Sequence, residues 1–97
     1  MKSHKLKDAG KRAFPIPPVA AWSGFGAVDG DIELEVRVQD IALQHLDPAA
    51  STGADHTPVL EKHRSKILKI AAEKYERGFI EPDNIILITY EDVAHLE

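Results

Sequence analysis

The chain has 97 residues, of which 43% are apolar and 29% are charged, and it contains no cysteine. A chain of this length builds one modest core and leaves little room for a deep catalytic cleft. The absence of cysteine excludes disulfides, thiolate nucleophiles and cysteine-bound metals, and we expect a cytoplasmic protein. The longest aliphatic run, residues 85–88, is far shorter than the ~18 residues of a membrane span, so we expect no membrane association.

Opposite charges are unevenly distributed along the chain. The formal net charge is −4, yet residues 1–14 carry +4 and residues 15–97 carry −8. A basic segment can hold a polyanion, but a −8 body repels a phosphate backbone, so nucleic acid is a disfavoured partner. Residues 1–18 are also rich in proline, and we interpret them as a flexible arm, with packing along a domain edge as the alternative. Residues 19–97 are expected to form a single domain.

The first two segments of this domain have the pattern of an antiparallel hairpin. Residues 21–28 combine small and aromatic side chains, and Asp29-Gly30 favours a two-residue type I′ turn. Apolar and charged residues then alternate over residues 31–38, which predicts one core face and one wet face. Four residues are expected on the core face: Ile32, Leu34, Val36 and Val38.

Helical periodicity follows the second strand. Residues 39–46 predict a short helix ended by Asp47-Pro48, and residues 48–55 have the composition of a surface loop. A long helix is expected from about residues 55–58 to Arg77, where Gly78 can end it. Its apolar residues recur at helical spacing and predict a buried stripe: Leu60, Ile67, Ile70, Ala71 and Tyr75.

A third strand is expected over residues 84–90, followed by a last turn over residues 91–96. The strand is apolar on both faces, which indicates a central strand or one covered by a helix. The complete pattern predicts an α+β fold of two layers. In this fold a three-stranded, mainly antiparallel sheet packs against one long and one short helix, in the order β-β-α-α-β. The strand order stays open, including a parallel pairing of the third strand with the first.

Several residue clusters taken in this order also resemble a known family. They are Trp22-Ser23-Gly24-Phe25, the alternating residues 32–36, the helix of residues 41–46, His63-Arg64 with the following stripe, and the closing residues 89–92. Together, across residues 20–93, they resemble the small bacterial domain-of-unknown-function family fourteen-eighty-eight. The resemblance implies an α+β fold and a bacterial origin. It implies no reaction, cofactor or site residue.

His63 and Arg64 are the candidate anion-binding residues, because they lie on the long helix beside its buried stripe. The planar guanidinium of arginine binds a carboxylate or a phosphate through two parallel hydrogen bonds. We expect such a site where these two side chains face the loop of residues 47–57. The alternative is that Arg64 pairs with an acidic residue of the sheet.

Trp22 and Phe25 are the candidate interface residues. They lie three residues apart on one strand, so they point to opposite faces of the sheet. One of the two rings is therefore available as an exposed anchor for a partner protein. The alternative is that the arm or the C-terminal turn covers that ring.

No catalytic, cofactor or metal site is predicted. The serines lack the context of a nucleophile elbow, and His56 and His63 are two helical turns apart, ~10.5 Å, which is too far for one zinc ion. We therefore expect a non-enzymatic protein-interaction module that binds an unidentified protein or, most simply, a second copy of itself. The alternatives are a binding or sensor domain for a small anionic ligand at His63 and Arg64, and weak nucleic-acid binding through the basic arm.

Overall fold

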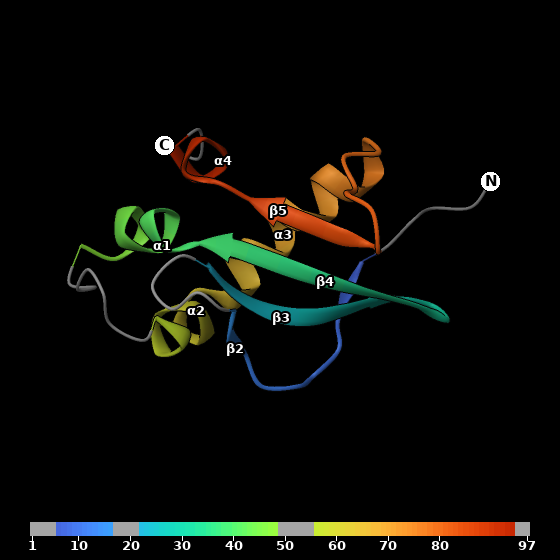
Figure 1. Ribbon diagram of the computed structural model, residues 1–97, viewed down its shortest axis with the longest axis horizontal. Coiled ribbons are helices and arrows are strands. Elements are labelled where there is room, and N and C mark those ends of the chain that lie inside the picture. The colour runs from blue at the N-terminus through green and yellow to red at the C-terminus, as the bar shows by residue number, and fades with distance from the viewer. Residues whose placement is uncertain (1–5, 17–21, 49–55, 95–97) are drawn as a thin grey trace.

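The computed structural model describes residues 6–16, 22–48 and 56–94 and has the α+β class that the sequence predicts. In this part of the chain the sheet has five strands, and four helices accompany it, instead of three strands and two helices. Figure 1 shows the elements, which in chain order are β1 (Lys7–Asp8), β2 (Phe14–Ile16), β3 (Trp22–Asp29), β4 (Ile32–Gln39), α1 (Asp40–Leu46), α2 (Thr57–Lys62), α3 (Arg64–Glu76), β5 (Ile85–Ile88) and α4 (Tyr90–Ala94).

The sheet is mixed, with the order β1-β3-β4-β5 and with β2 also paired to β3. β3 and β4 are antiparallel, and Trp22 lies opposite Gln39. β5 runs parallel to β4, with Glu35 opposite Ile85. The prediction of three strands is therefore wrong in its count. The sheet is mainly antiparallel as predicted, and β5, whose place the sequence left open, pairs in parallel with β4. The helices between β4 and β5 form a crossover connection, which returns the chain in the direction of β4.

Residues 6–16 belong to the sheet and its core, so the described part of the expected arm is not a flexible tail. β1 pairs with Ala27 and Val28, and β2 pairs along the first three residues of β3. Leu6 is buried in the core. Pro15 fits this edge position because proline has no N–H to donate within a sheet. The alternative of an arm packed along an edge describes these residues, while residues 1–5 and 17–18 lie outside the described ranges.

The turn between β3 and β4 lies one residue later than expected. Its central residues are Gly30 and Asp31, because Asp29 pairs with Ile32. Gly30 has a φ of +60° and Asp31 is not among the residues of positive φ, which is typical of a type II′ turn and not of type I′. Ile32 is therefore 47% exposed near the tip, although the alternation predicts it as a core residue. The next three apolar residues of β4 are buried as predicted.

The predicted long helix is divided into α2 and α3 at His63. This residue leaves helical geometry, with φ −107° and ψ 16°. Its N–H still donates to the carbonyl of Leu60, and its carbonyl still accepts from the N–H of Ile67, so the change of direction leaves both groups satisfied. The expected stripe is buried except for Tyr75, which packs at the edge of the core and donates its hydroxyl to Asp29.

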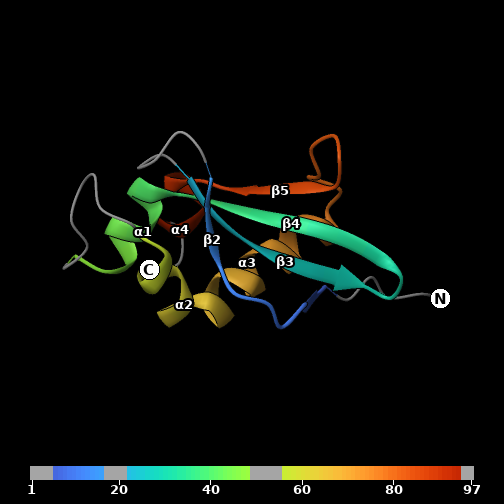
Figure 2. The ribbon, with the colours of Figure 1, turned by 60° about the horizontal axis from the view of Figure 1, so that its bottom comes forward.

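α2 and α3 lie on one side of the sheet, and α1 and α4 pack against each other at the end where β4 and β5 finish (Figures 1 and 2). The core forms between the sheet and these helices. Its largest fully buried apolar side chains are Phe25, Val36, Val38, Leu43, Leu60, Ile67, Ile86, Ile88 and Val93. In the described residues no helix lies on the other face of the sheet (Figure 2). Nor does any helix there combine the length and apolar character needed to cross a bilayer.

Candidate functional site

Arg64 has its guanidinium occupied by neighbouring carboxylates. Its Nε and Nη2 donate to the two carboxylate oxygens of Asp8 at 2.6 and 2.7 Å, and Nη1 donates to Glu61 at 3.0 Å. The guanidinium carbon also lies 4.7 Å from the centroid of the Phe25 ring. The side chain is only 12% exposed. An anion at Arg64 would have to displace Asp8 of β1, so the structure does not support Arg64 as an anion-binding residue.

The same carboxylates tie the N-terminal strands to the helices. Besides Arg64, Glu61 accepts a hydrogen bond of 2.8 Å from the N–H of Ala13. The pKa of Asp8 is lowered, mainly by its hydrogen bonds from Arg64. The pKa of Glu61 is lowered by the Ala13 N–H and then by Arg64, whose own pKa is raised by its hydrogen bonds to Asp8. We call these four residues, Asp8, Ala13, Glu61 and Arg64, the arm clamp.

His63 points away from Arg64, toward the end of α1. Its Nε2 lies 3.7 Å from an Asp47 carboxylate oxygen, and the Nζ of Lys62 lies 3.5 Å from the same oxygen. The structure therefore does not bring His63 and Arg64 into one site. Residues 49–55 of the loop that we expected them to face lie outside the described ranges.

Three buried polar residues form a cluster that the sequence reasoning missed. Ser23 donates to Asp40 at 3.4 Å, and the Nδ1 of His56 lies 3.3 Å from the other carboxylate oxygen of Asp40. All three are at most 4% exposed. In a catalytic triad the histidine lies between the serine and the aspartate and acts as the base for the serine hydroxyl. Here Asp40 lies between Ser23 and His56, so the order is not that of a triad. The cluster joins the starts of α1 and α2 to β3. Its members are far apart in the chain, so no local sequence pattern predicts that they meet.

Trp22 and Phe25 point to opposite faces of β3, as their spacing predicts. Phe25 is completely buried beneath Arg64, so it is not an interface residue. Its neighbours on the core side, Ser23 and Ala27, are buried as well. Trp22 lies on the opposite face and is only partly buried. Of the two candidate interface residues, the structure therefore leaves Trp22 accessible.

We call the sheet face that carries Trp22 the open face. It is formed by the outward-pointing residues of β3, β4 and β5, and Phe14 and Ile16 of β2 lie over Gly24 at its edge. The residues of the three longer strands are Trp22, Gly24, Gly26, Val28, Glu33, Glu35, Arg37, Gln39, Ile85 and Leu87. Glu35 and Arg37 form an ion pair at its centre. On β3 they lie opposite Gly26 and Gly24, which have no side chains to flank them. The open face thus combines a central ion pair with apolar residues on both sides.

Arg37 has spare hydrogen-bonding capacity on the open face. Its Nε is paired with Glu35, and its two Nη groups have no acceptor among the described residues. The side chain is 35% exposed. A second carboxylate can therefore bind Arg37 without displacing the first.

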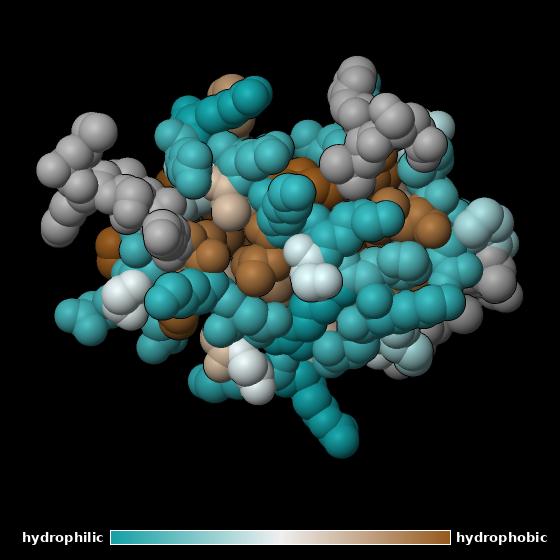
Figure 3. Space-filling model, turned by 180° about the vertical axis from the view of Figure 1, so that it is seen from behind, coloured by the Kyte–Doolittle hydropathy of each residue, from teal (hydrophilic) through white to brown (hydrophobic). Residues whose placement is uncertain are grey.

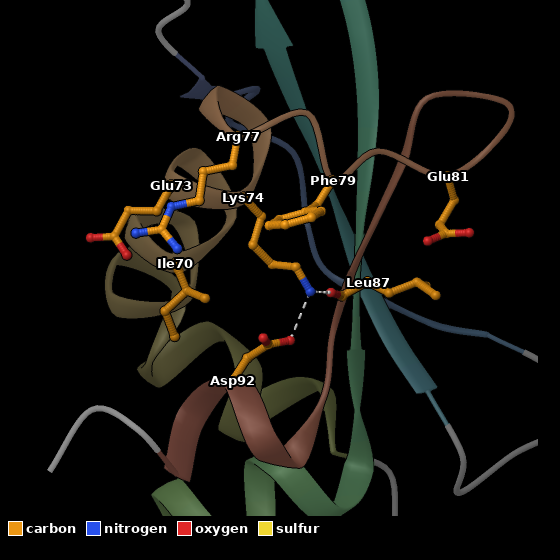
Figure 4. Close-up of a pocket in the computed structure, with 8 residues that line it drawn as sticks. All are labelled: Ile70, Glu73, Lys74, Arg77, Phe79, Glu81, Leu87 and Asp92. Carbon is orange, nitrogen blue, oxygen red and sulfur yellow. Dashed lines mark hydrogen bonds and ion pairs between the residues drawn. The ribbon is translucent and has the colours of Figure 1, made fainter.

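A hollow of about 530 Å³ lies on the helix side of the sheet (Figure 4). Figure 3 shows that apolar side chains gather on this side among polar ones. The walls of the hollow come from α3 and the residues that follow it, from β5 and from α4. Its lining residues are Ile70, Glu73, Lys74, Arg77, Phe79, Glu81, Leu87 and Asp92. This volume is in the range of small-molecule sites.

One ion pair closes the side of this hollow near α4. Lys74 donates to the Leu87 carbonyl at 2.6 Å and to Asp92 at 2.9 Å. Burial raises the pKa of Asp92, but hydrogen bonds from the Thr89 N–H and from Lys74 outweigh it and leave the pKa lowered. In the described part of the chain, no three histidine or carboxylate side chains gather as metal ligands.

Comparison with known proteins gives one informative likeness. No family model and no curated protein matches this chain. A crystal structure of a protein of unknown function from the DUF1488 family of Shewanella loihica PV-4 superposes with a TM-score of 0.72. The alignment covers 91% of this chain and 96% of that chain, at 12% sequence identity. The chain therefore has the fold of a bacterial DUF1488 protein, the domain-of-unknown-function family that its residue clusters resemble.

Proposed function

We propose that this chain is a member of the DUF1488 family and acts as a non-enzymatic protein-interaction module in the cytoplasm. Its partner in this proposal is a second copy of itself, bound through the open face. The observation that carries the proposal is the open face: in the described residues no helix covers it, and the ion pair at its centre bears both signs of charge. The cysteine-free sequence favours the cytoplasm as the compartment.

The central ion pair suits a symmetric dimer. In a two-fold interface, a residue of one copy contacts a different residue of the other, and the reverse contact occurs as well. An axis near the Glu35 and Arg37 pair brings each Arg37 to the partner's Glu35. The unused Nη groups of Arg37 supply the donors, and the four groups together carry no net charge.

Apolar side chains border the ion pair on both sides. Trp22 lies on β3, and Phe14 of β2, which is 36% exposed, has its ring close to Gly24 beside it. Ile85 and Leu87 lie on β5 and are partly exposed. An apolar region with a paired charge inside it is the composition of a specific interface, because the apolar area supplies affinity and the charges set the orientation.

The test is the mass of the protein in solution over a concentration series, measured by sedimentation. We expect a monomer–dimer equilibrium, and we expect Trp22→Ala to raise the dimer dissociation constant at least about tenfold. Phe79→Ala is the matched control, because it removes an exposed aromatic ring from the helix side. A monomer at every concentration contradicts the proposal, and so does an equal effect of the two substitutions.

A further inference from the structure

The hollow beside α3 contains two opposite charges that are not paired with each other. Glu73 and Arg77 are one helical turn apart and both line the hollow. The Arg77 N–H donates to the Glu73 carbonyl, but within the described residues neither side chain has a hydrogen bond or ion pair, although such neighbours on a helix commonly pair. Figure 4 shows both side chains extending along the α3 wall. The guanidinium of Arg77 is thus available to a ligand, whereas the guanidinium of Arg64 is already hydrogen-bonded to Asp8 and Glu61.

The other charged groups of the hollow limit what can bind there. Lys74 and Asp92 neutralise each other, so they present no net charge to a ligand. Glu81 adds a further carboxylate. The lining as a whole holds two cations and three carboxylates, so a phosphate or a dicarboxylate is repelled. A ligand that brings one negative and one positive group on adjacent atoms matches Arg77 and Glu73 together.

The apolar part of the hollow lies next to these charges. Phe79 is 58% exposed, which leaves most of its ring uncovered, and Ile70, which is 6% exposed, lines the same hollow. Figure 4 shows the Phe79 ring next to the Lys74 side chain. A ring or branched alkyl group on the ligand can pack against Phe79 while its charged groups reach α3.

We propose that the hollow binds a free α-amino acid with a large apolar side chain. Its carboxylate accepts two hydrogen bonds from the Arg77 guanidinium, and its ammonium donates to Glu73. Both groups of an α-amino acid are attached to one carbon, which fits partners one helical turn apart. Of the residues that line the hollow, only Leu87 also belongs to the open face, and the partners proposed for the ligand lie on and after α3, so the proposal does not depend on dimer formation.

The probe is L-phenylalanine, titrated into the full-length ¹⁵N-labelled protein while backbone amide shifts are recorded. We expect saturable shifts confined to residues 70–81, 87 and 92. L-Phenylalaninamide lacks the carboxylate and 3-phenylpropanoate lacks the ammonium, so each should bind at least about tenfold more weakly. L-Alanine lacks the ring and should also bind weakly. Equal binding of these compounds would overturn the proposal, as would the absence of shifts with L-phenylalanine.

Matched variants assign the binding to the named residues. Arg77→Gln and Phe79→Ala should each weaken L-phenylalanine binding at least about tenfold. Lys69→Gln is the control, because it removes a cation from the same helix outside this hollow. Both substituted side chains of the hollow are exposed, so circular dichroism should show an unchanged fold. Wild-type affinity in Arg77→Gln contradicts the assignment.

Discussion

Gly24 lies beneath two side chains of β2 and has no room for a side chain of its own. An added Cβ would be 3.0 Å from the Ile16 side chain and 3.0 Å from the Val36 carbonyl oxygen. We predict that Gly24→Ala lowers the free energy of unfolding by about 1–3 kcal/mol. Chemical denaturation measures this change.

Gly26 provides the control for that substitution. Its added Cβ would meet only Ala9, at 3.5 Å, which is ordinary contact. Gly26→Ala should therefore leave the free energy of unfolding within about 1 kcal/mol of the wild type. Equal destabilisation by both substitutions would show that β2 does not cover Gly24.

Arg64 holds β1 against the helices, so its removal should lower the stability of the folded protein. We predict that Arg64→Leu lowers the free energy of unfolding at neutral pH by about 1 kcal/mol, because the partly exposed carboxylate of Asp8 loses its partner. Lys69→Leu is the control and should stay within about 0.5 kcal/mol. A stable Arg64→Leu variant would return Arg64 to the list of ligand-binding candidates.

The arm clamp also predicts how stability depends on pH. The pKa values of Asp8 and Glu61 are lowered by folding from ordinary values of 3.8 and 4.5. Their contribution is therefore present above those values and is lost as the pH falls through the lower folded values. Arg64→Leu should flatten this acid dependence of the free energy of unfolding, measured by denaturation between about pH 5 and pH 2. An unchanged slope contradicts the clamp.

At the scale of elements, the segment of residues 6–16 behaves as part of the domain. Leu6 is 6% exposed and belongs to the core, whereas the next residue, Lys7, is exposed. We predict that Leu6→Ala lowers the free energy of unfolding by about 2–4 kcal/mol and that Lys7→Ala changes it by less than about 0.5 kcal/mol. Thermal and chemical denaturation test both. No loss with Leu6→Ala would mean that this segment is detached from the core.

The elements that could be predicted were those with a local signal. The alternation over Leu34, Val36 and Val38 gave the core face of β4 correctly, and the apolar spacing from Ile67 to Ala71 gave the buried side of α3. β1 and β2 were not predicted, because short edge strands lack their own periodicity and depend on the edge of β3. The break at His63 was also missed, since helical spacing continues through it.

The candidate sites were harder to predict because they depend on contacts between distant residues. The alternative that Arg64 pairs with an acidic residue of the sheet describes the structure, but the sequence did not identify that residue as Asp8, which lies 2.6 Å away across the fold. The buried cluster of Ser23, Asp40 and His56 was missed for the same reason, because its members come together only in the folded structure. Trp22 and Phe25 were separated correctly by face, because strand geometry alone decides that.

At the scale of the whole molecule, the two sides of the sheet have different roles in this account. The helix side contains the core and the hollow beside α3. The open face contains the ion pair on which the proposed dimer is built. Glu35 and Arg37 are both partly exposed and lie outside the core. Reversing the charge of either residue should therefore change dimer formation and leave the fold intact.

The measurement that tests this claim most directly is the mass of two charge-reversal variants, alone and mixed. Arg37→Glu gives each copy two adjacent carboxylates, and Glu35→Arg gives each copy two adjacent guanidiniums. We predict that each variant alone is monomeric at concentrations where the wild type is dimeric, and that an equimolar mixture restores a dimer. A mixture that stays monomeric, or variants that dimerise as well as the wild type, would contradict an interface centred on Glu35 and Arg37.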